Sequence, residues 1–299
     1  MMTVICRLRN LLALAALALA ACGVAPTPTE VAPEAPLDTA LRTFLADMGS
    51  DYGALSPDAL TEMLSNDSKP FLLDVRQPDE VEASGHIEGA AVIPLPDLAK
   101  RTAQLPAFDT PIVAYSGTGW RSTIGMTVLE LAGWNDVHSL LDGSYEGWLE
   151  RGYPVISGIP PAVQALNAAE PDPVLLAQIR QTLDNIPEGW GVIAPKELNQ
   201  VLAGAPDLVL IDVRSEDEIK SKGYIEGAER LVIPIEQFLA RRAEWPSDKD
   251  AAIVTYCGTG HRCTIAMTIL WSYGYTNVRN LEGGLKAWVE ARYPIAPGT

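Results

Sequence analysis

Short apolar runs and longer amphipathic segments alternate along most of the chain. The runs are rich in Val, Ile and Leu, as at 112–115 and 137–140, and they precede segments with helical spacing, as at 122–131 and 145–151. Strands that alternate with helices form βα units, and such units build parallel sheets covered by helices on both faces. The pattern therefore predicts an α/β fold with a central, mostly parallel sheet flanked by helices.

The same order of elements occurs twice. The segment 71–76 recurs as 209–214, 138 positions later, and the segment 115–121 recurs as 256–262, 141 positions later. Three further blocks repeat with nearly the same offset: 85–90 and 223–228, 140–148 and 280–288, and 153–154 and 293–294. This offset is too long for a solenoid repeat and indicates a duplicated domain. A length of 299 residues also suits two domains of roughly 150 residues each.

Proline-rich stretches mark the boundaries of the two copies. Four prolines lie between 157 and 173, and another four lie between 23 and 36. Because such stretches lack apolar periodicity, we interpret the first as a linker and the second as an extended tether. The predicted organisation is a signal peptide at 1–21, a tether at 22–37, a first domain at 38–156, a linker at 157–173 and a second domain at 174–299.

The first 21 residues have the features of an export signal. Arg7 and Arg9 precede an unbroken apolar run at 11–21, and these eleven residues are too few to span a bilayer, which needs about 20. The run ends in Leu-Ala-Ala-Cys at 19–22, which resembles the lipobox of bacterial lipoproteins. We therefore expect cleavage before Cys22, lipidation of its thiol, and export with anchoring to the bacterial cell membrane or envelope. The alternative is an ordinary signal peptide in which Cys22 is incidental.

Composition narrows the choice of partners. The chain has 22 Lys and Arg against 38 Asp and Glu, and its net charge of −16 argues against a nucleic-acid partner. Hydrophobic residues make up 47% of the chain, which is typical of globular proteins. Its four cysteines form no C-x-x-C motif and no cluster with histidines, so neither a disulfide framework nor a metal site is predicted. No cofactor is expected.

The candidate nucleophile lies in the second copy of the repeated loop. Cys257 directly follows the apolar run 253–256, and four residues separate it from Arg262. A residue between a parallel strand and a helix lies at the edge where open α/β sheets bind ligands. Gly258 and Gly260 allow the backbone to curl into a nest of N–H groups that binds anions. This nest and the Arg262 cation should lower the pKa of Cys257 below its ordinary value of about 8.5.

Taken together, the motifs resemble the rhodanese family of sulfurtransferases over roughly residues 38–297, as two tandem domains. The resemblance rests on four motifs: the Asp-Val-Arg strand, the Gly-His/Tyr-Ile-x-Gly-Ala turn, the Cys-x-x-Gly-x-Arg loop, and the ending in which a Trp follows a Gly after four residues. It implies that the Cys257 thiolate takes the outer sulfur of a donor such as thiosulfate and becomes a persulfide. The sulfur then passes to cyanide or to a thiol acceptor. The substrate-binding residues implied are Gly258, Thr259, Gly260, His261 and Arg262.

The length and residues of the Cys257 loop help to distinguish between possible activities. Related dual-specificity phosphatases and arsenate reductases have five residues between Cys and Arg, whereas the four found here favour a sulfur-sized substrate. The stretch 257–260 resembles the mercaptopyruvate-specific branch, but Arg262 closes the loop as in broad rhodaneses. Thiosulfate is our first choice of donor and 3-mercaptopyruvate the alternative. A non-catalytic sulfur-carrier or partner-binding module is a hypothesis of a different class.

The two copies differ at the nucleophile position. Ser116 occupies the place of Cys257, and a serine there has a much higher pKa and cannot store a sulfane sulfur. We therefore expect an inactive first domain packed on an active second one, with the active site near their interface, as the resemblance to tandem rhodaneses implies. The alternative is that both domains are inactive and serve as a scaffold.

Two residues beside the nucleophile have more than one interpretation. Cys263 matches Ser122 of the first copy, so packing or capping of the loop is favoured over a redox role. His261 matches Trp120, and it is either a pocket-wall residue that selects substrates or a solvent-exposed side chain.

Three charged residues of the second copy recur in the silent one. Because the silent copy keeps them, a structural ion-pair network explains them better than catalysis does. They are Asp212, Arg214 and Glu218, which match Asp74, Arg76 and Glu80.

Overall fold

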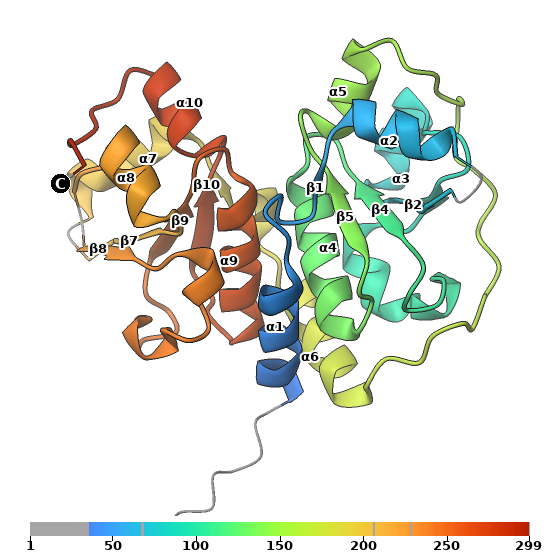
Figure 1. The fold of residues 1–299 in the computed structure, drawn as a ribbon, viewed down its shortest axis with the longest axis horizontal. Coiled ribbons are helices and arrows are strands. Elements are labelled where there is room, and N and C mark those ends of the chain that lie inside the picture. Colours follow the sequence, from blue (N-terminus) through green and yellow to red (C-terminus); the bar gives the residue numbers. More distant parts are fainter. Residues whose placement is uncertain (1–35, 67–68, 206, 228, 299) are drawn as a thin grey trace, which may run out of the picture. The chain divides into compact units, whose positions relative to one another are not determined.

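The computed structural model describes residues 36–66, 69–205, 207–227 and 229–298. The predicted signal peptide, Cys22 and nearly all of the tether lie outside the described residues. The described chain contains two five-stranded sheets, one in each copy of the repeat (Figure 1).

The first copy alternates strands with helices in the predicted order. Its strands are β1 (Ala54–Leu55), β2 (Phe71–Asp74), β3 (Ala91–Val92), β4 (Ile112–Tyr115) and β5 (Val137–Leu140). Its helices are α1 (Pro36–Asp47), α2 (Pro57–Leu64), α3 (Pro78–Ser84), η1 (Leu95–Lys100), η2 (Thr102–Gln104), α4 (Trp120–Ala132) and α5 (Ser144–Glu150), where η marks a 3₁₀-helix. Residues 157–172, which separate the copies, contain neither a helix nor a strand.

The second copy repeats this order. Its strands are β6 (Val192–Ile193), β7 (Val209–Asp212), β8 (Glu229–Val232), β9 (Ile253–Tyr256) and β10 (Val278–Leu281). Its helices are α6 (Pro173–Asp184), η3 (Glu188–Gly191), α7 (Pro195–Gly204), α8 (Glu216–Lys222), η4 (Ile235–Gln237), η5 (Arg242–Glu244), α9 (His261–Ser272) and α10 (Gly284–Glu290).

The two sheets have the same topology. Their strand orders are β1-β5-β4-β2-β3 and β6-β10-β9-β7-β8, and every pairing between these strands is parallel. The strand that precedes the candidate loop is central in each sheet: β4 lies between β5 and β2, and β9 lies between β10 and β7. The predicted α/β fold with parallel sheets flanked by helices is confirmed.

The helices that follow the two loops join the copies. Nearly every residue of α4 and α9 is buried, which is typical of a helix covered on all sides. The two helices contact each other, and they belong to one apolar cluster that contains residues of both copies. Helix α1 contacts α4 and η4, while α6 contacts η1, α4 and α9 (Figure 1). Both helices that precede a domain therefore pack against elements of both copies.

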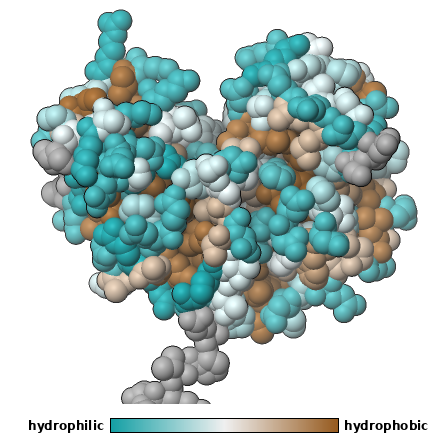
Figure 2. Space-filling model, viewed as in Figure 1, coloured by the Kyte–Doolittle hydropathy of each residue, from teal (hydrophilic) through white to brown (hydrophobic). Residues whose placement is uncertain are grey.

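One face of the molecule shows how polar and apolar side chains are distributed at the surface. The face shown in Figure 2 carries many hydrophilic side chains, with hydrophobic ones between them. Within the described ranges, no helix combines the length and the apolar character that crossing a bilayer requires.

Candidate active site

The loop that carries Cys257 lies where the sequence predicts it. Strand β9 ends at Tyr256 and helix α9 begins at His261, so the loop occupies the carboxyl edge of the sheet at a central strand. Its conformation depends on Gly260, whose φ of 104° is rarely adopted by other residues. A Cβ at this position would also lie 2.4 Å from Cζ3 of Trp120. Glycine is thus required here both by the backbone angle and by the close packing.

Backbone N–H groups of the loop surround the Cys257 sulfur. The N–H of Gly260 donates a hydrogen bond to Sγ with an N–S distance of 3.2 Å. The N–H groups of Thr259 and Cys263 also favour the charged form of the thiol. This arrangement is the predicted nest, built from the loop and the first turn of α9.

The environment of Cys257 stabilises a thiolate. Burial raises the pKa of its thiol, but hydrogen bonds from Cys263 and Thr259 and the positive charge of Arg262 outweigh that effect and lower the pKa to about 6. At pH 7 the thiolate then exceeds the thiol by about ten to one. The side chain is only 1% exposed, so the thiol does not lie at an open surface.

Arg262 is held by a carboxylate rather than left free. Its two terminal nitrogens donate to Glu218 over 2.7 Å and 2.6 Å, a bidentate pair. The hydrogen bonds from Arg262, together with the backbone N–H of Ser215, lower the pKa of Glu218 to about 2 despite its partial burial. Glu218 also closes the capping box of α8 with Ser215, so the start of that helix fixes the position of the ion pair.

The other predicted ion pair is structural. Arg214 donates to Asp212 through Nε at 2.8 Å and through Nη2 at 2.6 Å, and both side chains are fully buried. It also donates to the carbonyl of Gly223, which ties β7 to the end of α8. The expectation of a structural network agrees with this pair, but the partner of Glu218 is Arg262, which the sequence did not indicate.

His261 bridges the two copies. Its Nε2–H donates to the carbonyl of Tyr52 over 2.8 Å, and its Nδ1 lies 3.0 Å from the hydroxyl of Thr123. Burial lowers the pKa of this imidazole to about 4, so it is neutral at physiological pH. The side chain is 7% exposed, which rules out the solvent-exposed alternative. Both of its ring nitrogens are engaged by the first copy.

Cys263 packs under the loop. Its thiol donates to the carbonyl of Gly260 over 3.1 Å, and its side chain is fully buried. Burial and the neighbouring Cys257 raise the pKa of this thiol well above its ordinary value. Such a thiol is a weak nucleophile, in agreement with the packing and capping role favoured from the sequence.

The first copy contributes a residue that sequence analysis missed. Tyr52 has a φ of 58°, and its ring centroid lies 5.1 Å from the guanidinium carbon of Arg262. Its hydroxyl donates to Glu236 over 2.7 Å. The repeat held a signal for it, because Tyr52-Gly53 recurs as Trp190-Gly191 at the same offset of 138 positions.

A pocket of about 360 Å³ opens beside the loop and is lined by both copies. The second copy supplies Thr259, His261, Arg262 and Glu218, and the first supplies Asp51, Tyr52, Ala54 and Leu141. A neighbouring pocket of about 400 Å³ shares Leu141, Thr259 and His261 with it. The structure therefore brings three of the five predicted substrate-binding residues to one pocket, and Gly258 and Gly260 shape the loop behind it.

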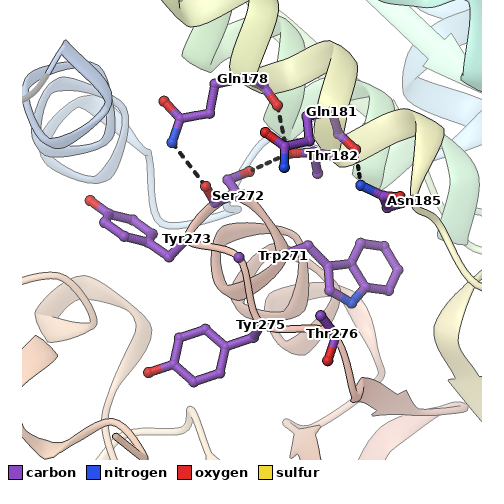
Figure 3. A pocket seen from close by; sticks show the side chains of 10 residues that line it. Gln178, Gln181, Thr182, Asn185, Trp271, Ser272, Tyr273, Tyr275 and Thr276 are labelled. Atoms are coloured by element: carbon purple, nitrogen blue, oxygen red, sulfur yellow. Dashed lines mark hydrogen bonds between the residues drawn. The ribbon is translucent and has the colours of Figure 1, made fainter. Parts of the chain in front are cut away.

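A larger cavity lies away from this loop. It has a volume of about 560 Å³ and lies between α6 and the end of α9, lined mainly by amide, hydroxyl and aromatic side chains (Figure 3). None of the residues from Cys257 to Arg262 lines it, so we do not assign it to chemistry at Cys257.

Comparison with known proteins supports the interpretation of the two domains. The family described as "Rhodanese-like domain" matches residues 56–151 and 194–291. A "Sulfurtransferase" of Allochromatium vinosum is 38% identical over 103 residues, which cover 34% of this chain and 92% of that protein. "Thiosulfate sulfurtransferase YnjE" of Escherichia coli is 26% identical over 219 residues, which cover 64% of this chain and 47% of that protein.

The chain is also similar to proteins with other printed names. A "tRNA uridine(34) hydroxylase" of Acaryochloris marina is 31% identical over 101 residues, covering 33% of this chain and 32% of that protein. The match thus spans most of the first relative but less than half of the other two. Among solved structures, that of YnjE covers 84% of this chain and 70% of its own, with 21% identity and a TM-score of 0.39.

The family matches cover both copies of the repeat and include both loops, with Ser116 in one and Cys257 in the other. The chain belongs to the rhodanese family of sulfurtransferases and carries two rhodanese-like domains in tandem.

Proposed function

We propose that the chain transfers a sulfane sulfur from thiosulfate to cyanide or to a thiol acceptor through a persulfide on Cys257. The observation that carries this proposal is the environment of the thiol, whose pKa of about 6 makes it a thiolate at neutral pH. The Gly260 N–H already donates to its sulfur. A sulfur nucleophile of this kind needs no metal or cofactor to attack a sulfane sulfur.

The cycle has two steps that balance without an added oxidant. In the first step the Cys257 thiolate attacks the outer sulfur of thiosulfate, the sulfur–sulfur bond breaks, and sulfite leaves with the electron pair. In the second step cyanide or a thiolate attacks the terminal persulfide sulfur, and Cys257 leaves as a thiolate. The negative terminal sulfur of the persulfide would be stabilised by the loop N–H groups that face the thiolate in the free protein.

The proposal is tested with the full chain and two variants. Thiocyanate formation from thiosulfate and cyanide should be abolished in Cys257→Ser and retained in the matched control Cys263→Ser, which copies Ser122 of the first loop. Intact mass after treatment with thiosulfate should show one added sulfur atom in the wild type and none in Cys257→Ser. Unchanged turnover in Cys257→Ser would overturn the assignment.

The alternative sulfur donor is 3-mercaptopyruvate. The pairing of Arg262 is the reason to compare it with thiosulfate. The Arg262 cation is already paired with Glu218, so the loop offers a dianion such as thiosulfate less charge than the sequence suggests. Measuring both donors in the same assay with the same acceptor decides between them. A protein that takes up no sulfur from either donor but retains a partner would instead support the sulfur-carrier or binding module.

We also propose that the chain is exported and anchored by lipid at Cys22. This proposal rests on the sequence of residues 1–22. Expression in a bacterium fed with labelled palmitate should label the wild type and leave Cys22→Ser unlabelled. Label on both proteins, or on neither, contradicts lipidation at this residue.

A further inference from the structure

The first copy contributes one wall of the pocket beside the Cys257 loop, and contacts with the second copy fix the position of this wall. Tyr52 makes three contacts with the second copy: its carbonyl accepts from His261, its ring lies on Arg262 and its hydroxyl donates to Glu236. Both Tyr52 and the following Gly53 have positive φ angles, 58° and 72°, which turn the backbone sharply at this point. The segment 51–53 is thus positioned by the domain whose pocket it covers.

The charges of this pocket do not balance. Arg262 is its one lining cation, and the bidentate bond to Glu218 compensates it. His261 is neutral because it is buried. Asp51 accepts a hydrogen bond from the N–H of Gly53 over 3.1 Å, but it has no ion-pair partner among the described residues. The carboxylate of Asp51 therefore leaves the pocket with a net negative charge.

Two further observations describe the surroundings of this charge. Asp51 lines the same pocket as Thr259, His261 and Arg262, which follow Gly258 in the segment that begins at Cys257. Glu236, which holds the hydroxyl of Tyr52, adds a second acidic group beside the same wall. A reactant that enters this pocket is therefore exposed both to the Asp51 carboxylate and to residues of the loop that follows Cys257.

We propose that Asp51 of the catalytically silent copy is a specificity-determining residue, which favours thiol acceptors carrying a cationic amine over acceptors carrying a carboxylate. This inference rests on the proposed function, because it concerns the second step of the sulfur-transfer cycle. An ammonium group gains Coulomb energy beside this exposed, unpaired carboxylate, whereas an anionic group of the same size loses it. The silent copy then contributes to the choice of substrate although it lacks a nucleophile.

The direct test measures discharge of the Cys257 persulfide in a single turnover. The full chain is loaded with thiosulfate, freed of excess donor, and mixed with 2-mercaptoethylamine, 2-mercaptoethanol or 3-mercaptopropionate, with rates expressed per thiolate. We expect the amine to react fastest and the carboxylate slowest. The variant Asp51→Asn should reduce the ratio of these two rates by about three- to tenfold, and Asp51→Lys should invert the order.

Asp47→Asn is the matched control. This variant removes the same charge four residues away, at the end of α1 and outside the pocket. It should leave the ratio unchanged. Equal ratios in the wild type and Asp51→Asn, or an equal decrease in Asp47→Asn, would overturn the proposal.

A second measurement separates this proposal from the proposed function. Cationic 2-aminoethyl and anionic 2-sulfonatoethyl methanethiosulfonate both form a disulfide with a thiolate and release methanesulfinate, so they report on access to Cys257 without any catalysis. Labelling is assigned to Cys257 by peptide mass. If thiosulfate forms no persulfide, the proposed function fails. The charge preference is still upheld if the cation-to-anion ratio of labelling rates falls in Asp51→Asn alone, and it fails if that ratio does not change.

Discussion

The loops that follow β4 and β9 have similar conformations, but one surrounds a hydroxyl oxygen and the other a thiol sulfur. Gly119 and Gly260 have φ angles of 110° and 104°, and each donates its N–H over 3.2 Å to the side chain at the nucleophile position. That side chain is the hydroxyl of Ser116 in the first loop and the thiol of Cys257 in the second. The loop geometry does not depend on the nucleophile, because the loop with Ser116 keeps the same glycine angle and the same N–H contact.

Each copy contributes an aromatic side chain that packs against the arginine in the loop region of the other copy. Arg121 pairs with Glu80 over 2.6 Å and lies 5.2 Å from the ring centroid of Trp190, which belongs to the second copy. Arg262 pairs with Glu218 over the same distance and lies under Tyr52 of the first copy. Each domain therefore covers the loop of the other with an aromatic side chain, and neither loop has its complete environment in one domain alone.

The largest effect should come from exchanging the two nucleophile positions. We expect Cys257→Ser to lower thiocyanate formation by on the order of a thousandfold or more. Adding Ser116→Cys in that background should restore sulfur uptake at the first loop, because its N–H groups and its arginine are in place. Intact mass with peptide mapping measures this uptake. An unmodified residue 116 would show that the two loops differ in more than the nucleophile.

The next effect concerns the histidine that only the second loop has. The pKa of His261 is depressed to about 4 by folding, so at pH values between about 4 and 6.5 the unfolded chain binds more protons and stability rises with pH. The rise amounts to roughly 3 kcal/mol over that range. Urea unfolding at pH 4.5 and pH 7 should show a smaller rise in His261→Gln than in the wild type. Equal rises in both proteins would contradict this role.

A pH profile tests whether the second loop supplies a thiolate. The rate of persulfide formation from thiosulfate should rise about tenfold per pH unit below pH 6 and level off above pH 7, because the folded Cys257 has a pKa of about 6. Stopped-flow mixing over pH 5–9 measures the profile. An inflection near pH 8.5, the value of an ordinary thiol, would show that the loop leaves Cys257 unperturbed.

The smallest effect should come from removing the carboxylate that pairs with the loop arginine, which we expect to matter in the second copy but not in the first. Glu218→Gln leaves the charge of Arg262 uncompensated, so the KM for thiosulfate should fall by about threefold. The matched variant Glu80→Gln changes the same contact in the silent loop and should leave KM and kcat unaltered. Steady-state kinetics of both variants measure the difference. An equal change in both would indicate a general effect on the fold rather than a local charge at Cys257.

Much of this molecule could be predicted from local patterns. The apolar runs at 112–115 and 253–256 are strands β4 and β9, and the duplicated blocks are two sheets with one topology. The position of Cys257 between a central strand and a helix also followed from the residues around it. These features are predictable because strand periodicity and glycine-dependent turns depend on residues close together in the sequence.

Contacts between residues that lie far apart in the sequence could not be predicted in this way. The recurrence of Glu218 in the silent copy predicts a network with Asp212 and Arg214, yet its guanidinium partner, Arg262, lies 44 residues further on. Tyr52 is 209 residues from His261, whose ring N–H donates a hydrogen bond to the Tyr52 carbonyl. No local spacing rule relates residues so far apart, and the contact between Tyr52 and His261 also depends on how the two copies pack through α4 and α9.

The sequence by itself determined the family, the duplication and the difference between Ser116 and Cys257, because each of these is written in residues that are neighbours along the chain. The tertiary structure alone decided that Arg262 is neutralised by Glu218, that His261 is buried against the first copy, and that Asp51 leaves the pocket negatively charged. The physical reason is that charge balance and burial depend on which groups lie together in space.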